Sequence, residues 1–273
     1  MNLLALPFST QRAMILAPHP DDDAIGAGGL LQRIVARGGE PYVVFVTDGE
    51  NNPWPQRFLD RKLFITADDR AAWGAMRRRE ALCSLSLLGI SSESAIFLGF
   101  PDQGIAEFGR RGDNRLIDAL RKIVADIQPS LIVSPSSFDL HADHRAIAYA
   151  IHSAAPNSAI TTYVVHGNAP ADRLLCHVEL SPREQDLKRA AIECHASQLA
   201  LSRERFLSYA RRNESFYAAE FEVARAESVF RERLFALRHM SRVIFGAYPS
   251  QDDLGVQPAA DVQDGAGDVP GLL

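Results

Sequence analysis

The sequence has few cysteines, no long apolar run and little surplus charge. Cysteine occurs three times in 273 residues, as Cys83, Cys176 and Cys194, and no two lie close together in the sequence. An odd, scattered set predicts neither a disulfide framework nor a cysteine zinc cluster, so we expect three small buried side chains in a reducing cytoplasm. No stretch approaches the roughly 18 uninterrupted apolar residues of a membrane span. The first residues lack the positive charge and cleavage site of a signal peptide.

The surplus of acidic residues is confined to one end. The net charge is −5, which argues against a nucleic-acid binder that relies on bulk positive charge. Residues 252–273 carry five aspartates and no basic side chain, among many Gly, Ala and Pro. We therefore expect residues 250–273 to be a disordered acidic tail. We expect residues 1–249 to be a single domain, with a core in 12–175 and a helical or extended part in 176–249. The oligomeric state stays open.

What the sequence does contain is a repeated alternation of short apolar runs and helical patterns. Apolar, β-branched runs predict strands at residues 13–17, 42–47, 95–98, 131–134 and 160–165. Helical spacing and end signals predict helices at residues 26–37, 70–88, 116–127, 143–154 and 182–199. Residues 200–245 are not divided between helix and strand. The alternation predicts an α/β, Rossmann-like fold, with a mainly parallel sheet and helices on both faces.

Two long segments, residues 49–69 and 100–113, show neither pattern and are predicted to be irregular loops. Long loops at the carboxyl edge of a parallel sheet are commonly functional. The first contains Trp54, Arg57 and Phe58, a mixture suited to sugar binding but equally typical of a surface flap.

The strongest local signal is PHPDDD at residues 18–23, directly after the first predicted strand. Three adjacent carboxylates repel one another and raise one another's pKa unless a cation neutralises them. The neighbouring His19 makes a divalent ion the natural neutraliser, because His nitrogen and carboxylate oxygen suit zinc or a similar metal. Asp23 could instead cap the helix that follows.

A second signal, HADH at residues 141–144, follows the strand at 131–134 and begins a helix. It therefore lies on the same carboxyl edge as His19. His141 and His144, three residues apart, can point the same way, and Asp143 can orient a ligand imidazole or cap the helix. HADH alone is a weak signal, but with PHPDDD it predicts a metal site at this edge.

A dinucleotide-binding fold is a rival interpretation, because GAGG at residues 26–29 follows a strand and opens a helix. The fingerprint would need glycine at Leu31, and three aspartates just before the helix would repel a pyrophosphate. A two-metal phosphoesterase would need more bridging ligands than the sequence offers. A non-catalytic metal- or sugar-binding module would be expected to lack a catalytic base, yet Asp21 is present.

Together, PHPDDD and HADH resemble the PIG-L/LmbE-like metal-dependent N-acetylglucosaminyl deacetylases, over most of residues 12–220. That family removes acetyl groups from N-acetylglucosamine-type sugars and conjugates. Further features resemble its pattern: Arg77 with Glu80, the segment Gly99 to Asp102, Lys188 with His195, Ser197 and Gln198, and Glu214 with Phe216. Asp23 is a departure, since the family more often has Glu there.

The resemblance implies a role for each motif residue. His19, Asp22 and His144 would hold the metal, Asp21 would be the general base, and His141 would stabilise the oxyanion in its protonated form. Such a metal lowers the pKa of bound water from about 15.7 towards about 7. The ion would be Zn²⁺ or another divalent ion such as Fe²⁺, Mn²⁺ or Co²⁺.

Four more residues are expected near substrate or in support of the site: Asp23, Arg77, Asp102 and Asp143. We expect Asp143 to keep His141 or His144 oriented. Arg77 and Asp102 would bind sugar hydroxyls or order the Asp21 loop. The expected function is zinc-dependent, cytoplasmic hydrolysis of an N-acetyl group on a small amino sugar or conjugate. Hydrolysis of another amide or ester, or sugar binding without catalysis, are the alternatives.

Overall fold

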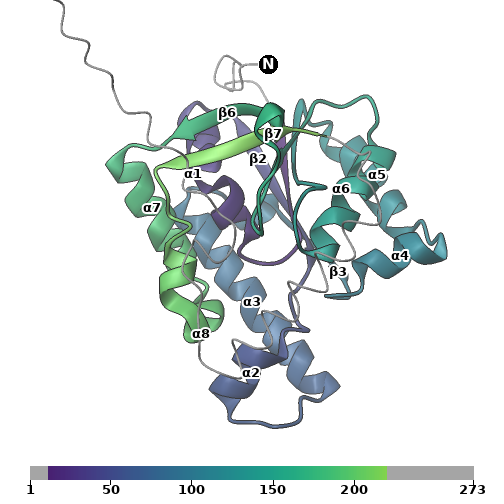
Figure 1. Cartoon of the computed structure of the whole chain (residues 1–273), viewed down its shortest axis with the longest axis vertical. Helices are drawn as coiled ribbons and strands as arrows, with labels where there is room; N and C mark the ends of the chain where they lie inside the picture. Colours follow the sequence, from purple (N-terminus) through teal and green to yellow (C-terminus); the bar gives the residue numbers. More distant parts are fainter. Residues whose placement is uncertain (1–11, 220–273) are drawn as a thin grey trace, which may run out of the picture.

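The computed structural model describes residues 12–219, and these form a sheet wrapped by helices (Figure 1). The acidic tail expected at residues 250–273 lies outside the described residues. The strands are β1 (Arg12–Ala17), β2 (Glu40–Thr47), β3 (Ala95–Phe100), β4 (Leu131–Pro135), β5 (Ile160–Tyr163), β6 (Leu174–Glu179) and β7 (Asn213–Ala218). Their order across the sheet is β3-β2-β1-β4-β5-β7-β6. Neighbours from β3 to β5 are parallel, whereas β7 is antiparallel to both β5 and β6.

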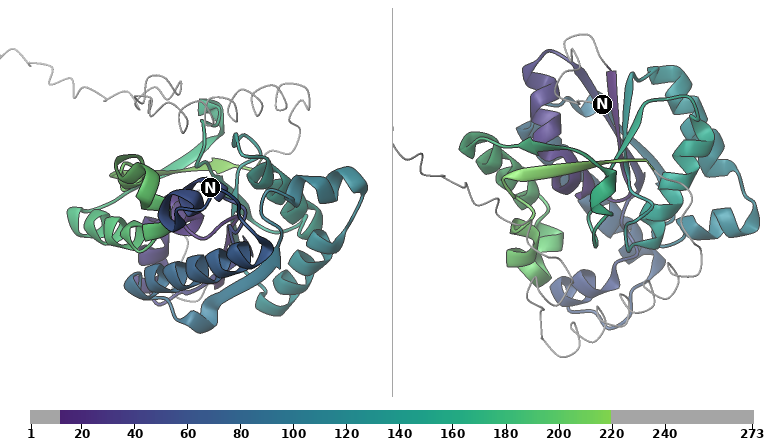
Figure 2. Two further views of the ribbon diagram at one scale, coloured as in Figure 1. Left: turned by 90° about the horizontal axis from the view of Figure 1, so that it is seen from below. Right: turned by 45° about the horizontal axis from the view of Figure 1, so that its top comes forward.

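Eight α-helices of the described part of the chain surround this sheet. They are α1 (Asp22–Ala36), α2 (Pro53–Asp60), α3 (Ala67–Leu87), α4 (Ile105–Arg111), α5 (Arg115–Ile127), α6 (Ala142–Ala154), α7 (Pro182–Glu193) and α8 (Ala196–Leu207). Two 3₁₀ turns, Ser92–Ser94 and Ala171–Arg173, precede β3 and β6. Figure 2 shows helices on both sides of the sheet. Within residues 12–219 no helix combines the length and the apolar character needed to cross a membrane.

The alternation of side chains along the central strands builds two cores. Ala13 and Ile15 of β1 face a core shared with α1, α3 and α7, whereas Met14 and Leu16 face one shared with α4, α5 and α6. All four are at most 1% exposed. A strand buried on both faces is what the continuous apolar run of β1 predicts. The mainly parallel sheet with helices on both faces is confirmed.

Three expectations about local structure are wrong. The segments 49–69 and 100–113 are not wholly irregular, because α2 and α4 lie within them. The helix expected to run from residue 182 to 199 stops at Glu193, and a new helix begins after His195. The break changes the direction of the chain and places Ser197 and Gln198 on α8.

The glycines of α1 serve packing rather than phosphate binding. A Cβ on Gly26 would lie 2.3 Å from Cδ2 of Tyr163, and one on Gly29 would lie 2.2 Å from Cδ2 of Leu180. Both glycines lie inside the helix, which already begins at Asp22, and not at the strand-to-helix turn where a pyrophosphate would sit. The dinucleotide-binding interpretation is therefore wrong.

A buried ion pair between Lys188 and Glu214 contacts the backbone of α1. Lys188 Nζ lies 2.6 Å from Glu214 Oε1 and also donates to the carbonyl of Ile25 at 2.8 Å. The Glu214 carboxylate accepts the backbone amides of Gly29 at 2.6 Å and Leu30 at 2.9 Å. In a regular helix the Gly29 amide would donate to the Ile25 carbonyl. Lys188 and Glu214 thus bind both halves of a helical hydrogen bond and join α7 and β7 to α1.

The order of the strands decides where chemistry can occur. The chain adds β2 and β3 on one side of β1, and β4 and β5 on the other. The connections that leave the carboxyl ends of β1 and β4 therefore diverge and open a crevice between them, the usual ligand position in such sheets. PHPDDD leaves β1 at this point, and HADH follows β4.

Candidate metal centre and active site

The PHPDDD loop is tied to the sheet edge by its own backbone. The Thr47 amide and hydroxyl at the end of β2 both donate to the Pro18 carbonyl, at 3.0 and 2.9 Å. Asp22 Oδ2 accepts the His19 amide at 2.9 Å and lies 3.0 Å from His19 Nδ1. The loop therefore orients the His19 ring and the Asp22 carboxylate against each other before any ligand arrives.

The loop after β4 is organised by Asp139, which the sequence analysis did not single out. Its carboxylate accepts the amides of His141 at 2.8 Å and Val165 at 2.9 Å. Its Oδ2 also lies 3.1 Å from His144 Nδ1. Asp139 thus fixes the His144 ring so that the opposite nitrogen, Nε2, points at Asp22 Oδ2, 3.2 Å away.

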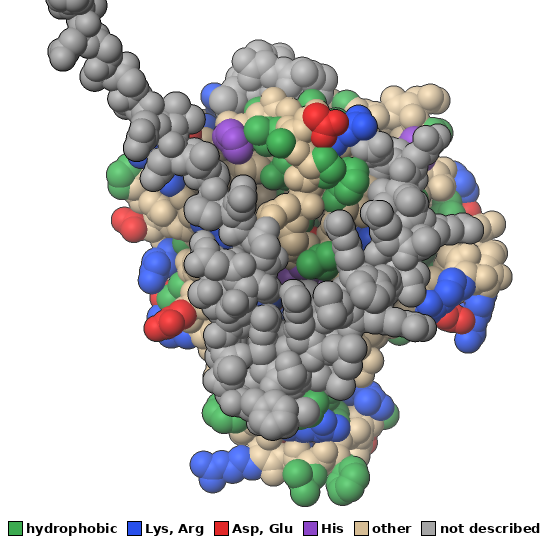
Figure 3. Space-filling model, in the orientation of Figure 1, with side chains coloured by type: hydrophobic (Ala, Val, Ile, Leu, Met, Phe, Trp, Pro, Cys, Tyr) green, Lys and Arg blue, Asp and Glu red, His purple; other side chains and the backbone are tan. Residues whose placement is uncertain are grey.

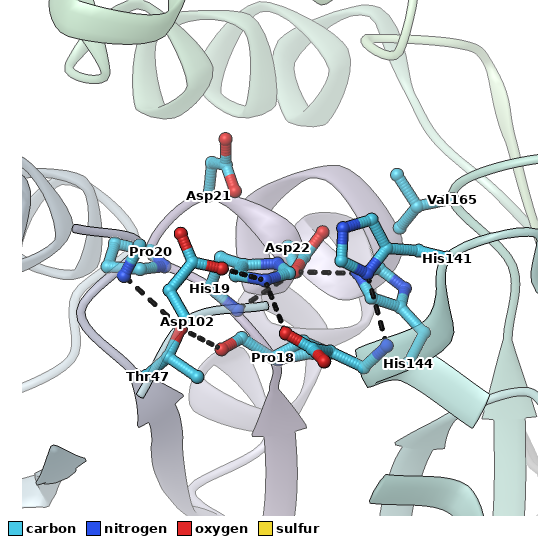
Figure 4. A network of polar contacts seen from close by, with 12 residues as sticks. Pro18, His19, Pro20, Asp21, Asp22, Thr47, Asp102, His141, His144 and Val165 are labelled. Atoms are coloured by element: carbon cyan, nitrogen blue, oxygen red, sulfur yellow. Dashed lines mark hydrogen bonds and ion pairs between the residues drawn. The ribbon is translucent and has the colours of Figure 1, made fainter. Parts of the chain in front are cut away.

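His19, Asp22 and His144 come together as expected for a metal site. Each offers a ligand atom, and these atoms lie within 4.8 Å of one another (Figure 4). The three residues are 9%, 3% and 0% exposed, respectively. Within residues 12–219, His19 Nε2 and both ring nitrogens of His144 make no aligned hydrogen bond, although each lies within 3.2 Å of a carboxylate oxygen. Buried imidazoles beside a carboxylate and without satisfied hydrogen bonds fit a zinc-type ion.

The charges around His19 and His144 also favour a bound cation. Burial lowers the pKa of His144, but Asp139 and Asp22 outweigh it and raise the value to about 10. Burial likewise opposes charge on His19, yet Asp102 and its other acidic neighbours raise its pKa well above the usual range. Without an ion, His19 and His144 therefore hold protons near neutral pH. A divalent cation supplies the same positive charge and releases those protons on binding.

A second, overlapping group of possible ligands consists of His19, His141 and Asp143. The Asp143 carboxylate, however, already accepts the backbone amides of Gln103 at 2.7 Å and Ile105 at 3.2 Å. Because the two groups share His19 and Asp143 has other partners, the arrangement favours one ion at His19, Asp22 and His144.

Asp21 lies between the metal group and Arg77. Its φ of 132° is in a region that non-glycine residues avoid, so the loop holds it under strain. Arg77 donates to the Pro20 carbonyl at 2.6 Å and the Gly49 carbonyl at 3.0 Å, and lies 3.3 Å from Asp21 Oδ2. Burial raises the pKa of Asp21 to about 7 despite that guanidinium. A carboxylate with this pKa can take up and return a proton near neutrality.

His141 is held as a neutral donor. Its Nδ1 accepts the Asp143 amide at 3.2 Å at the start of α6. Burial, with the like charges of His19 and His144, lowers its pKa to about 4. Since Nδ1 accepts, the ring proton belongs on Nε2. The protonated His141 expected from the sequence stays a prediction, whereas the lowered pKa and the accepting Nδ1 favour a neutral ring that donates through Nε2.

The supporting residues were predicted with mixed success. Arg77 orders the Asp21 loop, as expected. Asp102 lies 3.1 Å from His19 Nε2 and accepts the Asn51 amide at 2.9 Å, so it supports His19. The Asp143 carboxylate does not orient His141 or His144. The carboxylate that orients His144 belongs to Asp139.

Asp23 does not cap α1, and that expectation is wrong. It is fully buried inside the first turn of the helix, and neither of its carboxylate oxygens has a hydrogen-bond partner within the described residues. Burial raises its pKa to about 7. The residue at the N-cap position is Asp21, and its side chain makes no capping hydrogen bond.

Two further histidines stand near this centre. The ring of His166 lies 5.3 Å from that of His144 and 5.8 Å from that of His141, between ring centroids. The sequence analysis did not single out His166, because only the fold brings the loop after β5 next to the loop after β4. His195 is fully buried at the start of α8, and burial lowers its pKa to about 3.

The region around α3 and α8 contradicts the expectation for the cysteines. Cys83 is exposed rather than buried, and its Sγ lies 2.7 Å from Sγ of Cys194. The adjacent Ser197 donates its amide and hydroxyl to Glu80 at 2.8 and 2.6 Å. A separation of 111 residues in sequence concealed this pair.

The first long loop carries the aromatic residues expected to contact sugar. The Arg57 guanidinium stacks over the Trp54 ring, 5.1 Å from its centroid. Large exposed apolar side chains follow on α2 and just after it: Phe58, Leu59, Leu63 and Phe64. Figure 3 shows hydrophobic side chains at the lower end of the molecule, where Figure 1 places α2. A sugar-binding role for this loop stays a prediction.

Comparisons with solved structures agree with the fold. An N,N'-diacetylchitobiose deacetylase from Pyrococcus horikoshii has a TM-score of 0.59 at 23% identity, covering 76% of this chain and 82% of that one. A 4-carboxy-2-hydroxymuconate hydratase from Pseudomonas putida has a TM-score of 0.56 at 20% identity, covering 88% and 92%. Likeness at this identity shows the shared fold alone.

Sequence comparison is more specific. A 1D-myo-inositol 2-acetamido-2-deoxy-alpha-D-glucopyranoside deacetylase from Mycobacterium bovis is 30% identical over 149 residues, 50% of this chain and 48% of the relative. The chain thus spans about half the length of the curated relatives it matches. The family model described as PIG-L, GlcNAc-PI de-N-acetylase, matches residues 14–155, slightly more than half of the chain. This chain belongs to the PIG-L family.

Proposed function

We propose that this protein is a metal-dependent hydrolase that removes the N-acetyl group from an N-acetylglucosamine-type sugar or conjugate. The observation that carries the proposal is the position of Asp21 next to a buried group of potential metal ligands. His19, Asp22 and His144 offer ligand atoms within 4.8 Å of one another, and the pKa of the adjacent Asp21 is raised to about 7. Family membership and the acetamido-sugar deacetylase among its relatives support the choice of substrate.

His19, Asp22 and His144 would hold the ion, which we propose to be Zn²⁺ or another divalent metal. Two neutral imidazoles and one carboxylate would leave the loaded site with a net positive charge. When bound, such an ion acidifies water and polarises the acetyl carbonyl. Asp102 and Asp139 keep the two imidazoles aligned from behind, which is the usual function of carboxylates next to metal ligands.

Asp21 is proposed to move the proton. In its ionised form it takes a proton from the water that attacks the acetyl carbon, and it then returns that proton to the departing amine. Arg77 keeps the carboxylate and its strained backbone in place. The same carboxyl group thus acts first as base and then as acid, for which a pKa near neutrality is suited.

His141 is proposed to stabilise the oxygen that gains charge. Its neutral Nε2–H can donate a hydrogen bond to the former carbonyl oxygen once the carbon becomes tetrahedral. Loss of one such donor typically costs about 2.7–4 kcal/mol in the barrier. The accepting Nδ1, held by the Asp143 amide, keeps the proton on the correct nitrogen.

The substrate is proposed to be a small N-acetylated amino sugar or conjugate, and not a nucleic acid, in the cytoplasm. The near-neutral charge of residues 1–251 and the scarcity of cysteine support these two points.

A product screen tests the function. Metal-loaded protein is incubated with N-acetylglucosamine, its phosphates, its inositol-, lipid- and thiol-linked conjugates and chitooligosaccharides, and in parallel with simple amides and esters that lack a sugar. Both acetate and free amine are measured. We expect equal amounts of acetate and amine from at least one of these sugars. Binding of the sugars without either product would favour a non-catalytic sugar-binding module. Turnover of amides or esters that lack a sugar, with none of the sugars turned over, would favour a different hydrolase.

A further inference from the structure

A pair of cysteines outside the proposed active site has no role in that chemistry. Cys83 lies on α3, and Cys194 lies at the C-terminal end of α7, where the chain turns into α8. Their sulfur atoms are 2.7 Å apart, inside the contact distance of two non-bonded sulfurs. Among the described residues, neither cysteine belongs to a group of three metal ligands, so the pair is not part of a metal cluster.

We propose that Cys83 and Cys194 form a reversible disulfide that fastens α3 to the junction of α7 and α8. Neither helix has to move for the bond to form, because the two thiols already touch. Figure 1 shows α7 and α8 lying beside α3. Cys176, the third cysteine, lies on β6 and is not involved.

The surroundings show that this junction is held in place independently of the thiols. Ser197, three residues after Cys194, binds both oxygens of Glu80, which precedes Cys83 by three residues on α3. Residues three apart on a helix lie on the same face, so Glu80 and Cys83 present adjacent groups to the junction. The Ser197–Glu80 contact therefore keeps the two sulfurs together while they are reduced.

Exposure and pKa assign different roles to the two thiols. Cys83 is exposed and accessible to a small oxidant, whereas Cys194 is only partly exposed. Burial and the neighbouring Cys83 raise the pKa of the Cys194 thiol to about 12. Cys83 is therefore the group that attacks first, and Cys194 the one that resolves the intermediate.

The reaction is thiol–disulfide exchange with a low-molecular-weight disulfide such as oxidised glutathione. The Cys83 thiolate attacks one sulfur, breaks the external bond, forms a mixed disulfide and releases one small thiol. Cys194 then attacks the Cys83 sulfur, forms the internal bond and releases the second small thiol. Two protein thiols are oxidised, the external disulfide is reduced to two thiols, and the two protein protons leave with them.

The consequence is a change in stability that follows the redox state. The bond would link residues 111 positions apart. A cross-link that closes so long a loop strongly restricts the unfolded chain, provided that the native geometry is not strained. We expect the melting temperature to rise by about 5–10 °C on oxidation. The proposal does not depend on the deacetylase activity.

The test compares the full-length protein with Cys83→Ser, Cys194→Ser and the matched control Cys176→Ser. Each is equilibrated in buffers of reduced and oxidised glutathione, then analysed by intact mass, non-reducing peptide mapping and thermal unfolding. Circular dichroism of the reduced variants checks that all of them fold. Wild type and Cys176→Ser should lose two hydrogens, yield a linked peptide containing Cys83 and Cys194, and gain thermal stability that dithiothreitol reverses.

Cys83→Ser and Cys194→Ser should show neither the linked peptide nor the gain. Glutathione adducts on wild type without a linked peptide would overturn the proposal. A linked peptide without a rise in melting temperature would also contradict it, since the bond would then not fasten the native helices together.

Discussion

At the scale of single residues, the proposed reaction depends most on Asp21. It combines a strained backbone, a pKa raised to about 7 and a guanidinium partner in Arg77. Asp21→Asn keeps the shape of the side chain but cannot accept a proton. We expect it to retain one divalent ion per chain and to lower kcat by about 10²–10⁴-fold. Metal analysis and acetate release measure the two effects. Turnover equal to wild type would exclude Asp21 as the base.

The pH profile follows from the same residue. Because burial raises the pKa of Asp21, the carboxylate form is lost as pH falls through about 7. The value of kcat/KM should therefore rise with pH while Asp21 ionises and level off once it is fully ionised. The positive charge of a bound ion should shift this rise to lower pH. Measurement of kcat/KM between about pH 5 and about pH 8 checks this. An activity that falls as pH rises over the lower half of this range would contradict the assignment.

Asp139 should control metal affinity without being a ligand. It lies 3.1 Å from His144 Nδ1 and holds the loop through two backbone amides. Asp139→Asn removes the charge that aligns and polarises the imidazole. We expect the affinity for Zn²⁺ to fall by about 10–100-fold in competition with a chelator. Asp118→Asn on α5, where the carboxylate is exposed, is the control and should bind normally. If Asp139→Asn bound Zn²⁺ as tightly as wild type, the role of Asp139 would be limited to holding the loop after β4.

The residue scale also shows what sequence patterns can and cannot supply. Adjacent acids and paired histidines indicated a metal site, and the resemblance to the PIG-L family assigned His19, Asp22 and His144 as its ligands. Asp139 was missed because its role depends on the direction of the loop after β4, although its position five residues before His144 was a usable signal. The protonation state of His141 could not be predicted, because it depends on the Asp143 amide and on nearby positive charge.

At the scale of elements, α1 depends on α7 and β7. Lys188 and Glu214 are at most 2% exposed in their side chains and bind the Ile25 carbonyl and two amides of α1. Glu214→Gln would leave the ammonium group buried without its counter-charge. We expect a loss of about 3–5 kcal/mol in the free energy of unfolding. Urea denaturation measures it.

A double substitution tests whether the contributions of Lys188 and Glu214 to stability depend on each other. Combining Glu214→Gln with Lys188→Met removes both charges, so the double variant should lose less stability than the sum of the two single variants. Glu107→Gln, in an exposed ion pair on α4, should cost far less stability than Glu214→Gln. Additive losses in the double variant would show that the two residues act independently.

The elements differ in how far the sequence predicts them. The five parallel strands were predicted from short apolar or β-branched runs, which are buried in β1, β4 and most of β2 but only half-buried in β3. Strands β6 and β7 were not, since β7 pairs with strands distant in sequence and carries Glu214, whose burial makes sense only with Lys188. Helix α2 was missed because its two prolines suggest a loop, although both occur in its first turn, where proline is tolerated.

At the scale of the whole molecule, the sheet order joins motifs that are more than a hundred residues apart. Because β4 pairs with β1, His144 reaches Asp22 although β2 and β3 come between them in the chain. The net charge of −5 gives no sign of this arrangement. The assignment of residues 1–249 to one domain stays a prediction, as does the acidic tail.

Metal reconstitution tests the central claim most directly. Metal-free wild-type protein is titrated with Zn²⁺, Mn²⁺, Fe²⁺ or Co²⁺ up to one equivalent, and acetate release is followed on the best substrate from the screen. The account predicts no release without metal, a linear rise that ends at one ion per chain, and no bound ion in His19→Ala or His144→Ala. Full activity in the metal-free protein, or a saturating ion that binds equally well in both variants, would contradict it.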